Sequence, residues 1–394
     1  MPGPLAGLTV LDFSRLLPGP FATRLLADLG ADVIRVASTR HPDLLDVLPP
    51  VVDAGRGPVS AVSAWLQRGK RSIALALADP RGREVARRLA ARADVVIEQF
   101  KPGTMARFGL DATRLLAANP RLVYASLSAF GQTGPDAARP GHDLGALALS
   151  GLLSYTGTRA SGPPPLGLQI ADLASASNLA LAVLAAVIHR DRTGQGQHVD
   201  VAMLDAALDW NGLTGAAALG AGLDPGREEH LLNGGSLYGC YATADGRWLA
   251  FAGLEPHFVR AFAMAAGCPE LADGGVAPAD VPGARARLAA AVAARTLAEW
   301  EEVLAEVEAC AEPVLTLHEA LDRPQARARG MRLERPLADG ATLVQVGVPF
   351  HFSATPVVAG APGGPVGAHT REVLRESGFA AAEIDELGQA GVLA

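Results

Sequence analysis

The chain has 394 residues, of which 49% are hydrophobic, 19% charged and 5% aromatic. At about 100–200 residues per domain, this length predicts two to four domains, and the apolar fraction excludes disordered and fibrous proteins. The net charge of −7 argues against wholesale binding to nucleic acid or to an acidic membrane, because both partners require a basic surface.

Cysteine usage and hydropathy indicate where such a chain would work. Cys240, Cys268 and Cys310 lie far apart and form no C-x-x-C pair. This pattern fits a reducing compartment and argues against a disulfide scaffold or a zinc cluster. No apolar run reaches the roughly 18–20 residues that span a bilayer, and the first residues carry no basic signal region. We expect a cytoplasmic globular protein with no metal site and no membrane or nucleic-acid partner.

The beginning of the chain predicts a βαβ unit. Leu8–Phe13 is a short apolar run typical of a buried strand, and Pro18-Gly19-Pro20 interrupts it. Phe21–Leu29 has helical spacing and is followed by Gly30, a residue that commonly ends helices. Asp32–Val36 is a second strand candidate. This order predicts a parallel sheet with helices on its faces.

The same alternation continues to the middle of the chain. Further strands are expected at 71–77, 94–97 and 121–126, and helices at 81–93 and 178–189. Asp79-Pro80 is typical of a helix start, and Val199–Ala202 begins a strand or another helix. The first half of the chain is therefore predicted to be α/β.

The second half has a different pattern. Tyr238–Ala252 is predicted to form a hairpin, because two alternating runs flank Asp245-Gly246. Pro225–Glu229 is polar and reads as part of a linker, while Leu288–Val307 has helical composition. Val344–Phe352 is rich in strand-forming residues, which indicates an α+β middle section followed by a tail that returns to the first unit.

Two segments of the first half are candidates for a functional site. Pro18-Gly19-Pro20 lies between a strand and a helix, where doubly wound folds bind ligands. It is not a G-x-G-x-x-G fingerprint, so a tight turn is the simpler interpretation. His142 beside Asp143 can act as a general base next to a carboxylate, or Asp143 can cap a helix beside a surface histidine. The residues alone leave both interpretations open.

Three further positions are equally ambiguous. Asp172 lies in the apolar stretch LQIADLAS, where burial would raise its pKa into a range useful for proton transfer unless it caps the next helix. Glu255 precedes a proline after the hairpin, and a capping role is the simpler interpretation. Asn233-Gly234-Gly235 can bring its backbone close to a ligand or form a plain turn.

The order of longer sequence blocks resembles one family. The opening GPLAGLTVLDFSRLLPGPFATRLLADLGADVIRV is followed by RGKRSIAL, ADVVIEQFKPGTMARFGL and NPRLVYASLSAFGQTGP. RTGQGQHVDVAMLD, YATADGRWLAF, CAEPVLTLHEAL and GAHTREVLRESGF continue the series to the C-terminus. In this order the blocks resemble the family III coenzyme A transferases of the CaiB/BaiF superfamily, and within them the α-methylacyl-CoA racemase branch. The resemblance covers nearly the whole chain.

This resemblance implies a fold. We expect a large Rossmann-like α/β domain that binds CoA and is built from both chain ends, with a smaller α+β domain inserted between them. The large domain would span 1–205, a linker 206–229, the small domain 230–318, and a linker with the return to the large domain 319–394. Two chains are expected to form an interlocked homodimer.

The resemblance also implies a reaction. The position of Asp172 supplies the nucleophile of an acyl anhydride in transferases and an acid or base in racemases. The GHD around His142 and the LEPHF around Glu255 resemble the racemase pattern, with Glu255 coming from the partner chain. The expected reaction inverts C2 of a 2-methyl-branched acyl-CoA through an enolate, with His142 and Asp172 acting on opposite faces. Backbone N–H groups near Asp172 are expected to hold the enolate oxygen.

Ligand contacts follow from the same resemblance, and CoA is part of the substrate rather than a separate cofactor. The implied CoA contacts are Leu16, Arg71, Gln99, Phe100 and Arg107, and the implied substrate contacts are Asp143, Asn233, Gly234 and Gly235.

The chain departs from the family at two phosphate positions. Ser38 stands where an arginine is common and Ala78 where a lysine or aspartate is common, with Arg40 as the nearest substitute. Losing two such contacts would weaken CoA binding about 10²-fold. Alternatives to a racemase are therefore a CoA transferase acting through an Asp172 anhydride, and a divergent paralogue that is non-catalytic or binds a carrier-protein thioester.

Overall fold

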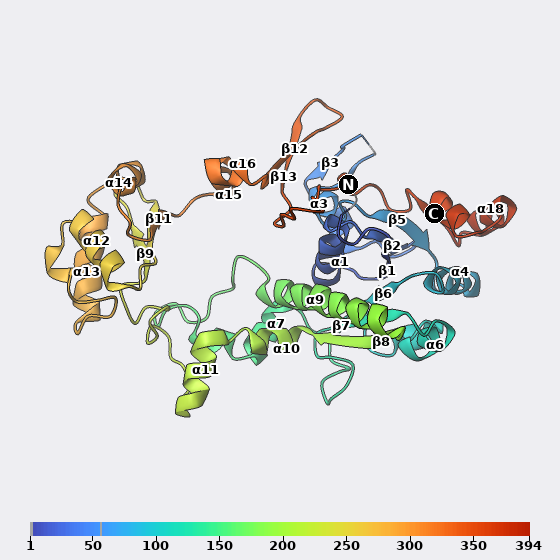
Figure 1. The fold of residues 1–394 in the computed structure, drawn as a ribbon, viewed down its shortest axis with the longest axis horizontal. Coiled ribbons are helices and arrows are strands. Elements are labelled where there is room, and N and C mark those ends of the chain that lie inside the picture. Colours follow the sequence, from blue (N-terminus) through green and yellow to red (C-terminus); the bar gives the residue numbers. More distant parts are fainter. Residues whose placement is uncertain (1–2, 56) are drawn as a thin grey trace. The chain divides into compact units, whose positions relative to one another are not determined.

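The computed structural model describes residues 3–55 and 57–394, which form two compact units. The larger unit is assembled from Met1–Leu147, Leu168–Trp210 and Arg323–Ala394. The smaller unit contains Ala148–Gly167 and Asn211–Asp322. Figure 1 shows that both ends of the chain belong to the larger unit.

The larger unit contains one six-stranded sheet, two small two-stranded sheets and the helices around them. Its strands are β1 (Thr9–Asp12), β2 (Asp32–Ser38), β3 (Val51–Val52), β4 (Val59–Ser60), β5 (Arg71–Leu75), β6 (Val95–Glu98), β7 (Val123–Ser128), β8 (Gln197–Ala202), β12 (Arg332–Pro336) and β13 (Thr342–Val346). Its helices are α1 (Pro18–Asp28), α2 (Leu44–Val47), α3 (Ala61–Leu66), α4 (Pro80–Ala90), α5 (Thr104–Phe108), α6 (Ala112–Ala118), α7 (Asp143–Leu149), α9 (Ile170–Thr193), α10 (Met203–Asp209), α16 (Pro324–Ala328), α17 (Thr370–Glu376) and α18 (Ala381–Gln389).

The main sheet is wholly parallel, and its order is β5-β2-β1-β6-β7-β8. After β1, the strands β2 and β5 are added on one side of the sheet. The chain then crosses to the other side of β1, where β6, β7 and β8 are added in order. This is a doubly wound arrangement, whose direction reverses between β1 and β6. Loops that follow these two strands diverge to opposite faces and leave a crevice at the carboxyl edge of the sheet.

Two apolar layers cover the sheet. On one face, α1 and α9 pack side by side over Val10, Val33 and Val95. On the other face, α4, α5, α6, α17 and α18 cover Leu11, Ile73 and their neighbours. Side chains of successive strand residues point to opposite faces, so a sheet that is buried on both sides needs the continuous apolar runs seen in the sequence.

The structure confirms the predicted strands of the main sheet, but the helix predicted at 178–189 extends over Ile170–Thr193, and the start of α1 also differs. The turn expected at Pro18-Gly19-Pro20 is instead the first turn of α1. Proline suits the first helical position because its fixed φ is already helical and its missing N–H would have no partner there. The start predicted at Asp79-Pro80 is confirmed, since the Asp79 carboxylate accepts a hydrogen bond from Arg81 N.

The C-terminal tail does return to the larger unit. Ala76 N donates to Val392 O at 2.9 Å, and Leu393 forms a bridge with Leu75 beyond the end of β5. Helices α17 and α18 contribute Leu374 and Ile384 to the same apolar layer as α4. The tail thus completes one face of the main sheet, whereas the strand-forming run predicted at 344–352 contributes to β13, which pairs with β12 in a separate two-stranded sheet.

Helix α9 is long and apolar enough to cross a membrane by length and composition. The sequence analysis expected no such segment, because charged and polar residues interrupt its apolar run. Half of its most apolar window is buried inside the protein, where Leu179 and Val183 pack against the sheet. A core helix of a folded domain passes the same test, so the finding is weak evidence for a membrane span.

The smaller unit is α+β, as predicted. Its strands are β9 (Gly239–Ala242), β10 (Trp248–Phe251) and β11 (Ala311–Pro313), which form one antiparallel sheet. Its helices are α8 (Leu152–Tyr155), α11 (Gly212–Ala221), α12 (Pro256–Ala265), η1 (Pro269–Leu271), α13 (Val281–Val292), α14 (Leu297–Leu304) and α15 (Leu317–Asp322).

Two details of the smaller unit refine the sequence analysis. The hairpin around Asp245-Gly246 is present, and Gly246 adopts the positive φ of 73° that such turns require. The single helix expected at 288–307 is two helices, because Thr296 ends the first run and starts α14. Its hydroxyl and the Glu299 side chain form a reciprocal capping box.

The observed division differs from the predicted boundaries at 148–167 and 211–229. These segments were expected in the large domain and in a linker, but they cluster with the smaller unit. Hydrogen bonds supply the reason. Tyr155 Oη donates to Asn211 Oδ1 at 2.9 Å, and Arg227 donates to the carbonyls of Leu153 and Thr156.

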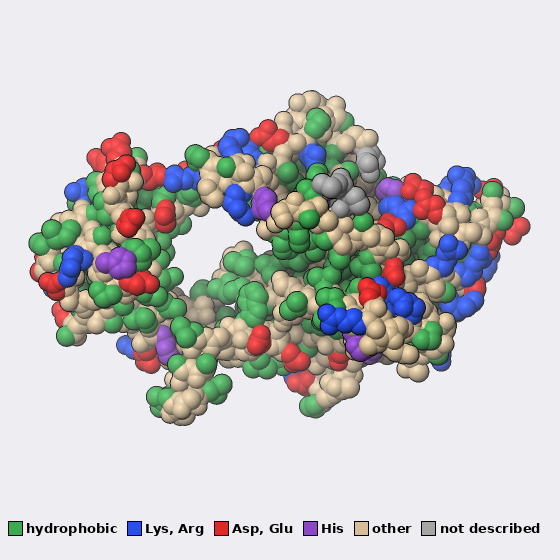
Figure 2. All heavy atoms as spheres, in the orientation of Figure 1, with side chains coloured by type: hydrophobic (Ala, Val, Ile, Leu, Met, Phe, Trp, Pro, Cys, Tyr) green, Lys and Arg blue, Asp and Glu red, His purple; other side chains and the backbone are tan. Residues whose placement is uncertain are grey.

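Charged side chains cover the outer helices of the larger unit. Figure 2 shows both signs interspersed over the region of α4, α6 and α18. Most of these charges are paired, as in Arg87–Glu84, Arg114–Asp111 and Arg371–Asp385. A mixed, paired surface of this kind is typical of a solvated face.

A buried charge cluster beneath α1 gives a stability prediction. Asp28 accepts from Arg24 at 2.9 Å and from Arg68 at 2.9 and 2.7 Å, and all three side chains are buried. Asp28→Asn leaves two guanidinium groups without their counter-charge. We expect a loss of about 3–5 kcal/mol in the free energy of unfolding, measured by urea denaturation.

Glu84→Gln is the matched control, because its Arg87 ion pair is exposed and is worth less than about 1 kcal/mol. A loss for Asp28→Asn as small as that of the control would show that the buried cluster does not stabilise the fold.

Candidate functional site

A cavity of about 470 Å³ opens at the carboxyl edge of the main sheet, beside the point where the strand order reverses. Phe13, Ser14 and Arg15 line it after β1, and Phe100 lines it after β6. The segments that follow β2 and β5 complete the wall, so four loops from neighbouring parallel strands meet around one space. Volumes of this size accommodate small-molecule ligands.

The mouth of the cavity is positively charged. Arg15, Arg40 and His41 line it and are exposed to solvent. Arg35 also lines the wall, but its guanidinium is bound to Asp46 by two hydrogen bonds of 3.0 and 2.6 Å. The charge available to a ligand therefore comes from the loop arginines, which suits an anionic group at the mouth.

Ser38 organises the loop that carries these charges. Its hydroxyl accepts hydrogen bonds from Arg40 N at 3.2 Å and His41 N at 3.0 Å. This turn places both side chains at the cavity mouth. Ser38 thus contributes to the positively charged mouth through the backbone rather than through a charge of its own.

The interior of the cavity combines apolar walls with one unused polar atom. Leu75, Leu77 and Ala78 form part of its lining, and Phe100 packs edge-on against Phe108. Within the described residues, the buried Thr39 hydroxyl has no hydrogen-bond partner. A buried polar atom without a partner is costly to the fold.

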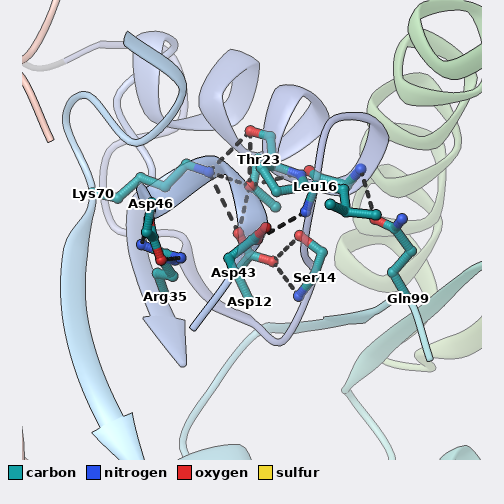
Figure 3. A network of polar contacts seen from close by, with 11 residues as sticks. Asp12, Ser14, Leu16, Thr23, Arg35, Asp43, Asp46, Lys70 and Gln99 are labelled. Atoms are coloured by element: carbon teal, nitrogen blue, oxygen red, sulfur yellow. Dashed lines mark hydrogen bonds and ion pairs between the residues drawn. The ribbon is translucent and has the colours of Figure 1, made fainter. Parts of the chain in front are cut away.

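The loop after β1 is held in place by side chains from two other loops (Figure 3). Leu16 N donates to Asp43 Oδ2 at 2.8 Å, and Gly19 N donates to Gln99 Oε1 at 3.0 Å. Leu16 has a φ of 59°, an unfavourable conformation for leucine that such contacts must maintain. A Cβ on Gly19 would lie 2.5 Å from Gln99 Oε1, so only glycine allows this approach.

The structure brings most of the implied CoA contacts to this region. Phe100 and Arg40 line the cavity, while Leu16 and Gln99 form and support the loop beside it. Arg107 lies on α5, next to the cavity residue Phe108.

Arg71 is placed differently. It lies at the opposite end of β5 from the cavity-lining residues, where it pairs with Asp32, Glu372 and Glu376. The structure therefore does not bring Arg71 to the cavity.

A second group of candidates meets at the start of α9. Asp143 Oδ1 accepts hydrogen bonds from Ala171 N at 2.7 Å and Asp172 N at 3.2 Å. The Asp143 carboxylate therefore caps α9 from a different helix, α7, although the helix supplies no side-chain cap of its own. Asp172 lies within the first turn of α9, so the interpretation of Asp172 as the cap is wrong.

Asp172 is poised to exchange a proton near neutral pH. Burial and, to a smaller extent, the neighbouring charge of Asp143 together raise its pKa to about 7. Both causes penalise the ionised form of Asp172. A shifted carboxyl of this kind is typical of catalytic acids and bases.

The expected enolate donors are already in use. The N–H groups of Ala171 and Asp172 donate to Asp143, and Leu173 N donates to Gln169 O. These three backbone groups therefore do not form a ready oxyanion site in this structure.

His142 and Glu255 belong to different units. His142 directly precedes Asp143 and is exposed in the larger unit. Glu255 precedes α12 in the smaller unit, where its exposed side chain makes no capping hydrogen bond. The capping interpretation of Glu255 is therefore wrong, and its carboxylate remains available for another role.

Asn233, Gly234 and Gly235 form a turn in the smaller unit. Asn233 Oδ1 accepts from His230 N, and Asn233 Nδ2 donates to Tyr155 O at 3.1 Å. Gly234 adopts a φ of 108°, which a side chain would strain. The plain-turn interpretation accounts for these contacts.

Sequence reasoning missed several residues that shape the cavity. Asp43 and Thr39 lie in a loop with no recognisable motif, and nothing in their sequence context marks them. Asp12 and Lys70 carried a weak signal, because a charged residue ends the apolar strand β1 and Lys70 is one of two lysines in the chain. Their importance depends on contacts between segments far apart in sequence.

The sheet, the cavity and the carboxylate pair are those of an α/β enzyme. The model of CoA-transferase family III matches residues 5–370, and the chain belongs to this family. It is 36% identical to the α-methylacyl-CoA racemase of Mus musculus, over 97% of this chain and 96% of the relative. It is 34% identical to the succinate–glutarate CoA-transferase of Agrobacterium fabrum, over 95% of each chain.

The fold agrees with solved relatives. A crystal structure of a CAIB/BAIF family protein from Brucella suis superposes with a TM-score of 0.83 at 30% identity. The match covers 96% of this chain and 100% of that chain. Because a racemase and a transferase are similar to the chain at nearly the same identity, similarity assigns the family and the residues must decide the reaction.

The Asp143–Asp172 pair gives a prediction about proton affinity. Asp143→Asn removes the like charge but keeps an oxygen that can cap α9. We expect the pKa of Asp172, about 7 in the wild type, to fall toward that of an ordinary carboxyl. Titration of the Asp172 carboxyl carbon by ¹³C NMR measures this shift.

Asp136→Asn is the control for that titration, since Asp136 forms an exposed ion pair with Arg139. An unchanged Asp172 titration in Asp143→Asn would mean that the Asp143 charge does not act on Asp172.

Proposed function

We propose that the protein is an acyl-CoA racemase that inverts C2 of a 2-methyl-branched acyl thioester. The observation that carries this proposal is the raised pKa of Asp172, about 7, in the same unit as His142. A nucleophile must be ionised, whereas a proton donor must be protonated for part of the time. A carboxyl with a pKa near 7 can both give and accept a proton at neutral pH, which suits acid–base chemistry.

The reaction then needs one group on each face of the α-carbon. His142 removes the C2 proton, the electrons pass to the thioester oxygen as an enolate, and protonated Asp172 returns a proton to the opposite face. In the reverse direction the two groups exchange roles. Glu255 of the partner subunit would assist His142 in this scheme, as the family resemblance implies.

The substrate proposed for the cavity is the nucleotide end of CoA. Phe100 offers an aromatic wall for a base. Arg40 and Arg15 supply the positive charge that phosphates require. CoA is part of the substrate, so the proposed reaction uses no separate cofactor.

We propose a homodimer as the working form, and a reducing cytoplasm as its setting. Apolar side chains remain exposed on single helices of both units, including Leu181 and Ile188 on α9 and Leu213 and Leu219 on α11. Exposed apolar faces of this extent are typical of protein interfaces. The three cysteines are free thiols, which a reducing compartment would preserve.

Solvent exchange tests the reaction. In D₂O with a 2-methylacyl-CoA and no acceptor acid, the wild type is expected to incorporate deuterium at C2. His142→Ala and Asp172→Asn should each slow inversion at C2 by about 10²–10⁴-fold, because inversion requires an acid–base group on each face. ¹H NMR of the C2 position measures the rate.

His189→Ala provides a control, since this exposed histidine lies near the far end of α9. Inversion at the wild-type rate in both active-site variants would contradict the acid–base assignment. Formation of an Asp172 hydroxamate with hydroxylamine, without C2 exchange, would instead identify a CoA transferase.

The cavity mouth gives a separate prediction about the substrate. Arg40→Ala should weaken CoA binding about tenfold or more while leaving 3′-dephospho-CoA binding unchanged, because a charge-assisted phosphate contact is lost. Isothermal titration calorimetry with both ligands measures the difference. Arg92→Ala, an exposed arginine beyond α4, is the control.

Equal binding of CoA and 3′-dephospho-CoA by the wild type would contradict a phosphate contact at the mouth. It would favour the alternative substrate, an acyl group on a carrier protein.

A further inference from the structure

Lys70 is a buried lysine whose role the proposed reaction does not explain. Its ammonium donates to Thr23 Oγ1 at 2.7 Å and to Pro20 O at 2.9 Å, and lies 3.5 Å from Asp12 Oδ2. The Lys70 side chain is 1% exposed and that of Asp12 is fully buried. Figure 3 shows Lys70 reaching from the start of β5 toward the end of β1 and the first turns of α1.

Asp12 connects this lysine to the loop that lines the cavity. Its Oδ1 accepts from both Ser14 N at 2.9 Å and Ser14 Oγ at 2.5 Å, and its Oδ2 accepts from Thr23 Oγ1 at 2.5 Å. Ser14 is itself a cavity residue. The Lys70 ammonium therefore lies next to one oxygen of Asp12, and the other oxygen of Asp12 binds the cavity residue Ser14.

The Pro20 carbonyl extends the same support along the loop. Pro20 follows Gly19, whose N–H reaches Gln99 across the point where the strand order reverses. Lys70 thus contacts both ends of the segment Ser14–Pro20, at Asp12 before it and at Pro20 within α1. The Thr23 hydroxyl contacts the same two groups, Asp12 Oδ2 at 2.5 Å and Pro20 O at 3.3 Å, and the Lys70 ammonium donates to that hydroxyl as well.

We propose that Lys70 is a positioning residue for ligand binding: its ammonium fixes the loop Ser14–Gly19 in the shape that lines the cavity, and loss of its charge loosens that loop. Lys70 does not touch the cavity itself, so it acts through Asp12 and Pro20. The assignment of CoA as the ligand rests on the proposed function, whereas the support of the loop does not.

The charges around Lys70 set its protonation. Asp12 on β1 favours the ammonium, while Arg35 on β2 and Arg24 on α1 oppose it. Burial is the largest influence and lowers the pKa of Lys70 to about 8. When Lys70 is neutral, the Asp12 carboxylate remains buried without its counter-charge. Ligand binding should therefore weaken as the pH rises through about 8.

The effect of Lys70 titration on global stability has the opposite sign to its effect on ligand binding over this pH range. An unfolded lysine has a pKa of about 10.4, so the unfolded chain holds the proton more tightly than the folded chain. The Lys70 contribution to the free energy of unfolding therefore increases as the pH rises from about 8 toward about 10.4. A loss of binding near pH 8 without loss of folding therefore identifies a local effect.

The experiment uses CoA as the probe, with the full chain and calorimetric titration from pH 6.5 to 9.5. Wild-type affinity should fall by about tenfold or more across this range. Lys70→Met should bind CoA at pH 7 at least about tenfold more weakly than the wild type and should lack the wild-type pH dependence. Thr23→Val, which removes only the bridging hydroxyl, should show a smaller loss in the same direction.

Lys101→Met is the matched control, because Lys101 is exposed and is the other lysine of the chain. Since there are only two lysines, ¹⁵N labelling of lysine resolves both ammonium groups by NMR. The Lys70 signal should titrate near pH 8.

A second measurement needs no ligand. Amide hydrogen exchange at Ser14 and Gly19 should be faster in Lys70→Met than in the wild type at the same pH, with core amides of β6 unchanged. If the wild type fails to bind CoA, the proposed function is wrong, and this exchange still tests Lys70. If Lys70→Met bound CoA as tightly as the wild type and its loop amides exchanged at the wild-type rate, the proposed role of Lys70 would be wrong.

Discussion

The parallel pairing of β1 with both β2 and β6 is the constraint on which the rest of the molecule depends. It places β1 at the centre of the sheet and reverses the strand order beside it. Loops after β1 and β6 must then separate to opposite faces, and a crevice forms without any dedicated pocket-forming element. The cavity, its positively charged mouth and the contact between Gly19 and Gln99 all follow from this one reversal.

Buried or half-buried carboxylates are the second recurring feature of the larger unit. Asp12, Asp28 and Asp143 each bind groups from separate segments, and each fixes something that apolar packing alone would leave free. Asp143 has the greatest chemical consequence. By accepting the N–H groups at the start of α9, it secures the backbone of Asp172 and also raises the proton affinity of that carboxyl. The Asp143 side chain therefore both stabilises the start of α9 and influences the acid–base chemistry of Asp172.

Much of the architecture was predictable because local pattern and global fold agree. The strands of the main sheet, the long helix α9 and the hairpin at Asp245-Gly246 follow from apolar runs and turn residues. The start of α1 at Pro18 and the break at Thr296 were missed, since each depends on capping geometry within one turn. The segment 148–167 was misplaced because hydrogen bonds to Asn211 and Arg227, not its own sequence, attach it to the smaller unit.

The sequence by itself determined the family, the alternation of strands and helices, and the residue types available for proton transfer, because these are properties of pattern and composition. Only the tertiary structure decided which groups meet. It directed Arg71 to an ion-pair cluster away from the cavity, gave Ser38 a backbone role, and placed Lys70 beside Asp12. Proton affinities and ligand contacts depend on burial and on neighbours from distant segments, and those distances are set only when the sheet closes around its core.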